Sequence, residues 1–127
     1  MNLLILAIII NGILFPVVQQ PDENMLFVSS VKNEFTEYTL SDEFNTPILF
    51  AHNYLAGKYL YNISVNDEVG IVFIDHTDIY KITVRNYEHN YKDLDIIQKY
   101  YLLEKLVLQT CYKKGLLFLL GEYEYTK

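Results

Sequence analysis

The stretch LVLQTCYKKGLLFLLG, residues 106–121, contains two apolar runs separated by a short basic segment. The runs Leu106–Thr110 and Leu116–Gly121 are brief and rich in Leu, Val and Phe, which favours strands. Lys113 and Lys114, followed by a glycine, break the apolar pattern between them. The segment therefore predicts two consecutive strands joined by a basic turn.

The chain before this segment shows the same strand-forming character. In Ile79–Glu88, IYKITVRNYE, the side chains of Tyr80, Ile82 and Val84 fall on one face, as in a half-buried strand. Further strands are predicted over Met25–Val31, Glu34–Leu40, Pro47–Ala51 and Glu68–Ile74.

One segment has a different period. In Asp93–Glu104, DLDIIQKYYLLE, the apolar residues recur at spacings of three and four, which predicts a helix. Seven or eight short strands and one helix indicate a mainly β protein. We expect an antiparallel barrel or sandwich with an inserted helix.

Composition limits both the architecture and the function. A chain of 127 residues corresponds to one domain, and 51 % apolar with 20 % charged residues excludes a disordered chain. The net charge is −6 and the sole arginine is Arg85, so nucleic-acid binding is not expected. One cysteine and three histidines without ligand spacing predict neither a metal site nor a cofactor.

The first residues allow two interpretations. Residues 1–11 open with the apolar run LILAIII, which suits either a secretory signal or membrane anchor, or a first buried strand. The run is too short to span a bilayer, which requires ~20 residues. We place the barrel domain at residues 12–127, with membrane attachment through the N-terminus as one of the alternatives.

Cys111 and His52 are the candidate reactive residues. Both follow short apolar strands, and a Cys–His pair is a recurrent thiol nucleophile with its general base. Lys113 and Lys114 follow the cysteine, and neighbouring cations lower the pKa of a thiol. The alternatives are a buried structural cysteine and a loop histidine bonded to backbone.

Two motifs resemble the sortases, the cysteine transpeptidases of bacterial surfaces. LVLQTC, residues 106–111, is similar to the family's TLxTC signature, with Val107 in place of the first Thr. LFAHNYLAGKYLYNISVNDEV, residues 49–69, is similar to the segment that carries the catalytic histidine. The resemblance covers residues 14–121 and implies a closed, mostly antiparallel β-barrel of eight strands.

The resemblance also implies a reaction. Cys111 would attack a peptide carbonyl in a sorting signal and form a thioester, and His52 would protonate the leaving amine. An amine acceptor or water would then release the acyl group. The substrate would be a peptide or protein met outside the cytoplasm, so an extracellular or membrane-anchored location is implied. Asn53 and Thr110 are candidates for the substrate groove.

One part of the sortase pattern is missing. The family's arginine, which supports the oxyanion, aligns with Leu116, itself a groove candidate, whereas Arg85 lies on an earlier strand. Lys113 or Lys114 would have to replace it, although lysine lacks the planar fork of arginine.

Three functions therefore remain open. They are a working sortase-like transpeptidase or peptidase, a degenerate sortase-fold protein that binds an extended peptide without turnover, and an unrelated barrel with Cys111 in its core.

Overall fold

A computed structural model describes residues 4–21, 27–89 and 91–127. The strands are β1 (Ala7–Ile10), β2 (Ile13–Gln19), β3 (Phe35–Glu37), β4 (Ile48–Phe50), β5 (Glu68–Val72), β6 (Thr77–Glu88), β7 (Leu106–Tyr112) and β8 (Gly115–Thr126). The helical segments are α1 (Leu40–Phe44), η1 (Ala56–Asn62), α2 (Asp93–Lys99) and η2 (Tyr101–Leu103), where η marks a 3-10 helix.

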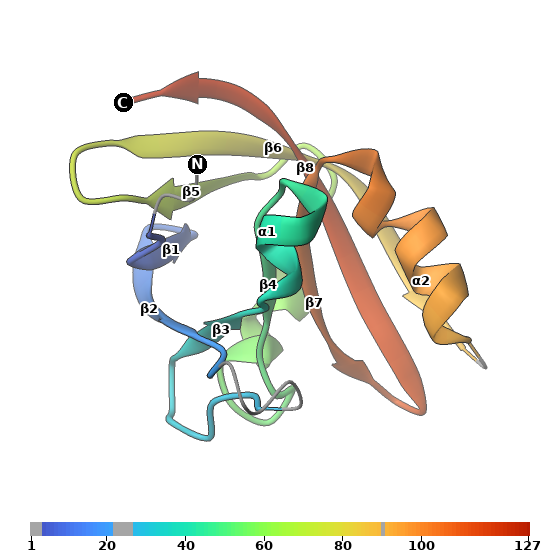
Figure 1. Cartoon of the computed structure of the whole chain (residues 1–127). Helices are drawn as coiled ribbons and strands as arrows, with labels where there is room; N and C mark the ends of the chain where they lie inside the picture. The colour runs from blue at the N-terminus through green and yellow to red at the C-terminus, as the bar shows by residue number, and fades with distance from the viewer. Residues whose placement is uncertain (1–3, 22–26, 90) are drawn as a thin grey trace.

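The eight strands form a closed barrel in the order β1-β2-β3-β4-β7-β8-β6-β5 (Figure 1). β1 closes it by pairing with both β2 and β5. The expectation of a mainly β, closed barrel is confirmed, but the sheet is mixed and not antiparallel throughout. β2 pairs with β3 and β4 pairs with β7 in parallel. The connections from β2 to β3 and from β4 to β7 are each long enough to return the chain to the same end of the sheet, which a parallel pair requires.

The β7–β8 hairpin forms as expected from the opening segment. Leu106 pairs with Gly121 and Tyr112 pairs with Gly115, so residues 113 and 114 make the turn. Lys113 adopts a positive φ of 53°, which lets the two strands reverse within two residues.

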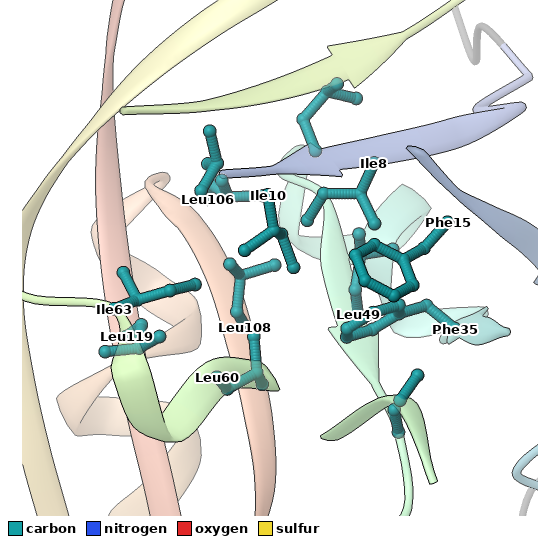
Figure 2. Packing of buried hydrophobic residues seen from close by; sticks show 14 of the residues in the cluster. Ile8, Ile10, Phe15, Phe35, Leu49, Leu60, Ile63, Leu106, Leu108 and Leu119 are labelled. Carbon is teal, nitrogen blue, oxygen red and sulfur yellow. The ribbon is translucent and has the colours of Figure 1, made fainter. Parts of the chain in front are cut away.

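The interior of the barrel is apolar (Figure 2). The interior core includes Ile8, Ile10, Phe15, Phe35, Leu49, Leu60, Ile63, Leu106, Leu108 and Leu119. A second cluster, the outer core, lies on the outside of the barrel and is formed by Ile48, Phe50, Ile96, Tyr100, Tyr101, Val107, Leu116, Phe118 and Leu120. Alternate residues of β4 and β7 enter the two cores, as the two-residue period of a strand requires.

The helical segments differ in detail from the sequence-based prediction. The helix expected over Asp93–Glu104 is divided into α2 and η2, and Glu104 ends it with a positive φ of 56°. α2 lies outside the barrel beside β7 and β8 (Figure 1), where Tyr100 stacks on Phe118 at 4.1 Å between ring centroids. α1 was not predicted, and it begins at Leu40, the last residue of the strand expected over Glu34–Leu40.

Two further strand predictions changed. Only Phe35–Glu37 of the strand expected over Glu34–Leu40 is formed. The strand expected over Met25–Val31 lies partly outside the described residues, and residues 27–31 form no strand. Within the described ranges, we find no helix with the length and apolar character needed to cross a membrane.

Candidate functional site

The parallel pair β4–β7 brings the two candidate reactive residues to neighbouring strand ends. The register pairs Phe50 with Gln109, and the Ala51 N–H then donates to the Gln109 carbonyl oxygen over 3.4 Å. Continuing this register by two residues places His52 beside Cys111. Residues 51 and 110, one step earlier, are joined by a side-chain hydrogen bond of 2.6 Å.

Both reactive side chains lie on the outer face. Ala51 belongs to the interior core, whereas Phe50 belongs to the outer core and Cys111 packs against it. Alternation along β4 therefore directs His52 outward as well. The His52 ring stands edge-on to Phe50 at 6.5 Å and stacks on Tyr54 at 5.2 Å, both between ring centroids. These two ring contacts fix the orientation of the imidazole on the outer face.

The thiol and the imidazole are close in register but not bonded. Within the described part of the chain, no hydrogen bond joins the Cys111 and His52 side chains. Catalytic hydrogen bonds are often long in a protein without substrate and tighten when substrate binds. Burial raises the pKa of the Cys111 thiol. The expectation that Lys113 and Lys114 lower this pKa is therefore wrong.

The lysines fail to act on the thiol because of strand geometry. Lys113 Nζ lies 5.4 Å from the centroid of the Tyr112 ring, and Tyr112 packs against the interior core. Successive residues of a strand point to opposite faces, so Tyr112 and Cys111 point apart. Lys114 is exposed in the turn. Lys113 and Lys114 are therefore close to Cys111 in sequence without lying beside its thiol.

Leu116, the residue at the arginine position, pairs directly with Cys111 across β7 and β8. It is 8 % exposed and belongs to the outer core, so an aliphatic side chain lies beside the thiol. Arg85 is used elsewhere, because its Nη1 donates to the Leu60 and Ile63 carbonyl oxygens, each over 3.2 Å, at the end of η1.

The other two groove candidates occupy different environments. Asn53 is half-buried directly after His52. Thr110 is 0 % exposed, and its Oγ1 donates to the Ala51 carbonyl oxygen. Thr110 therefore lies beneath the outer surface and holds the ends of β4 and β7 together.

Sequence reasoning missed one residue that holds the cysteine strand. The Tyr61 hydroxyl donates to the Cys111 carbonyl oxygen over 2.7 Å, a contact across fifty residues of chain that no local pattern signals. Gly57 donates its N–H to the His52 carbonyl oxygen over 3.0 Å. A Cβ at this position would meet Thr110 Oγ1 at 2.2 Å, so η1 docks here only with glycine.

A cavity of about 460 Å³ lies between the end of β6 and α2. It is lined by Glu88, His89, Tyr91, Asp95, Gln98 and Lys99. Leu116 of β8 pairs with Cys111 of β7 on one side and with Glu88 of β6 on the other. Glu88, which lines the cavity, therefore lies in the same cross-strand row as Cys111. In the described ranges, we find no cluster of three or more metal-ligating side chains.

Solved structures similar to this one are sortases. Sortase A of Listeria monocytogenes superimposes with a TM-score of 0.69 at 12 % identity, covering 97 % of this chain and 89 % of that one. A sortase from Actinomyces oris gives 0.70 at 12 % identity, covering 97 % and 81 %. Sortase C1 of Streptococcus suis gives 0.69 at 16 % identity, covering 95 % and 73 %.

No family model matches the sequence, and the search of curated proteins found no relative. The structural likeness extends over nearly the whole chain in the sortases above. The chain therefore has the sortase fold, as the two sequence motifs predicted.

Proposed function

We propose that this protein is a sortase-like cysteine transpeptidase or peptidase that cleaves a sorting-signal peptide through a thioester acyl-enzyme. The observation that carries the proposal is the placement of His52 and Cys111. His52 lies two residues past the end of β4, Cys111 is the penultimate residue of β7, and both face the outer side of the barrel.

The reaction follows from these two side chains. His52 takes the thiol proton as Cys111 Sγ attacks the scissile carbonyl carbon. The C–N bond then breaks, and His52 gives the proton to the leaving amine. An amine acceptor or water attacks the thioester, and the C–S bond breaks to regenerate the thiol. Transfer to an amine makes the protein a transpeptidase, whereas transfer to water makes it a peptidase.

The proposed reaction needs His52 as a base because Cys111 is partly buried. A thiol whose pKa is raised by burial holds little thiolate at neutral pH. Removing the proton during attack avoids the need for a preformed thiolate. The cavity lined by Glu88, the cross-strand partner of Leu116, would receive part of an extended peptide.

A second candidate function is binding of an extended peptide without turnover. It is favoured by Leu116, because an aliphatic side chain stands where sortases place the arginine beside the oxyanion. Loss of one oxyanion donor typically lowers the rate by ~10²–10³.

Labelling with peptides separates the two functions. The protein is incubated with a library of extended peptides that contain a Thr–Gly bond, and acyl adducts are detected by intact mass. We expect an adduct on the wild type, none on Cys111→Ala, and formation slowed by about 10²–10⁴ in His52→Ala. Equal peptide binding by wild type and Cys111→Ala, with no adduct, would support binding without turnover.

The proposed substrate also suggests a location and a role for the N-terminus. Sorting signals are met outside the cytoplasm, so we place the protein there. Of the alternatives for residues 1–11, we favour the strand. β1 pairs on both edges, and its removal would open the barrel between β2 and β5.

A further inference from the structure

The 3-10 helix η1 contacts the main chain of both reactive residues. The Gly57 N–H donates to the His52 carbonyl oxygen over 3.0 Å, and the Leu55 N–H, just before the helix, donates to the same oxygen over 3.0 Å. Near the other end of η1, the Tyr61 hydroxyl donates to the Cys111 carbonyl oxygen over 2.7 Å. One short element therefore bonds the carbonyl groups of the two residues that the proposed reaction pairs.

The Cys111 carbonyl group lies where strand pairing has stopped. Carbonyl groups two residues apart on a strand point to the same side, and the Gln109 carbonyl oxygen accepts from the Ala51 N–H. The Cys111 carbonyl therefore points toward the side of β4, but β4 ends at Phe50. A main-chain carbonyl that leaves a sheet needs another donor. The Tyr61 hydroxyl supplies it where no strand continues.

Tyr61 is itself held through its backbone neighbours and its ring. Arg85 Nη1 donates to the carbonyl oxygens of Leu60 and Ile63, each over 3.2 Å, so the guanidinium fixes the end of η1. The Tyr61 ring packs against the interior core and stands edge-on to Tyr112 at 5.3 Å between ring centroids. Because the side chain is already fixed, its hydroxyl loses little conformational entropy on bonding.

A second connection between the two segments lies one step before the reactive residues. Thr110 Oγ1 donates to the Ala51 carbonyl oxygen over 2.6 Å and sets where β4 and β7 meet. η1 then adds hydrogen bonds at the next residue of each segment, and these residues carry the imidazole and the thiol.

We propose that Tyr61 is a positioning residue. Its hydroxyl holds the main chain at Cys111 so that the thiol stays within reach of the His52 imidazole, and Arg85 keeps η1 in place for this contact. This inference rests on the function proposed above and adds the group that aligns the pair. Proton transfer needs heavy atoms ~2.6–3.2 Å apart, and a displacement of ~1 Å can lower a rate ~10²-fold.

The test measures alkylation of Cys111 by iodoacetamide against pH. The Sγ–C bond forms, the C–I bond breaks and iodide leaves, while His52 takes the thiol proton at neutral pH. At alkaline pH the thiol is already ionised, so the plateau rate reports access to Sγ alone. The ratio of the neutral rate to the alkaline rate therefore measures how well His52 serves the thiol.

Tyr61→Phe removes the hydroxyl and keeps the ring. We expect it to lower the neutral rate ~10-fold or more and to leave the alkaline plateau unchanged. Adding His52→Ala should then cause little further loss, because both changes remove the same proton transfer. Tyr59→Phe, on the same helix with its ring against Phe15, is the matched control and should change neither rate.

Arg85 provides a second variant of the same contact. Arg85→Ala removes both hydrogen bonds to the end of η1 and should lower the neutral rate by a smaller factor than Tyr61→Phe. Arg85→Lys keeps a cationic donor at this position and should restore part of the lost rate. Neither substitution should change the alkaline plateau.

Three results would overturn the assignment of Tyr61. An unchanged pH profile in Tyr61→Phe would show that the hydroxyl only satisfies a carbonyl group, and equal slowing at neutral and alkaline pH would show that Tyr61 only packs the site. In both cases the proposed function stands. Identical profiles for wild type and His52→Ala would remove the pairing, so the proposed function and this inference would fail together.

Discussion

The inner and outer faces of β4 and β7 differ in chemistry although they belong to the same two strands. On the inner face, Leu49 and Leu108 are fully buried and belong to the apolar interior core. On the outer face, Gln109 bonds to Tyr101, and Cys111 remains partly accessible. The period of a strand thus lets one face hold the barrel together while the other positions the reactive groups.

The largest effect on stability is expected from truncating a buried side chain on the inner face. Leu108→Ala removes a fully buried side chain and should lower the free energy of unfolding by about 2–5 kcal/mol. Leu102→Ala, at a side chain that is 56 % exposed, is the matched control and should stay within ~0.5 kcal/mol. Urea unfolding measures both, and equal losses would contradict the inner face as the source of stability.

The second-largest effect is expected at Gly57, where η1 packs against the ends of β4 and β7. A Cβ on Gly57 would lie 2.6 Å from the Ala51 carbonyl oxygen and 2.7 Å from that of His52, besides the contact with Thr110. Gly57→Ala should therefore cost about 1–3 kcal/mol and move the end of β4 that carries His52.

Unfolding and thiol alkylation of Gly57→Ala are measured together. Adding Thr110→Ala removes the shortest contact but leaves both carbonyl contacts, so it should restore little. A Gly57→Ala protein with unchanged stability and unchanged Cys111 alkylation would show that η1 does not position the site.

The smallest effects come from two glutamates on opposite faces. Glu37 is paired with Leu49 on the inner face, and burial raises its pKa above the ordinary 4.5. Its contribution to stability is full below about pH 4.5 and is lost as the pH rises through the raised value. Glu37→Gln should therefore gain stability relative to wild type as the pH rises to neutral.

Glu88 on the outer face should behave in the opposite way. Hydrogen bonds from Lys99 and Tyr100 lower its pKa, so its contribution is present above pH 4.5 and is lost as the pH falls through the lowered value. Glu88→Gln should lower stability at neutral pH and lose this effect in acid. Thermal unfolding across pH gives both slopes, and slopes of the same sign would contradict the contrast between the faces.

The sequence predicts strands better than it predicts their partners. The alternation of β6 and the β7–β8 turn are local patterns, and both segments form as expected. The parallel pairs were not foreseen, because a two-residue period is the same whichever direction the neighbouring strand runs.

For the candidate site too, local patterns were predicted from the sequence, whereas contacts between distant segments were not. Apolar strands predicted from the sequence marked His52 and Cys111, but the hydrogen bond from Tyr61 to Cys111 joins distant parts of the chain. Adjacency in sequence suggested that Lys113 and Lys114 act on the thiol, whereas the strand directs consecutive side chains to opposite faces.

The most direct test of the paired site is the alkylation rate of Cys111 by iodoacetamide from acidic to alkaline pH. Wild type is compared with His52→Ala, and His76→Ala, in the β5–β6 turn, is the control. Because burial raises the thiol pKa, we expect reaction near neutral pH to depend on His52 and to move to alkaline pH in His52→Ala. Identical profiles for wild type and His52→Ala would contradict the pairing of Cys111 with His52.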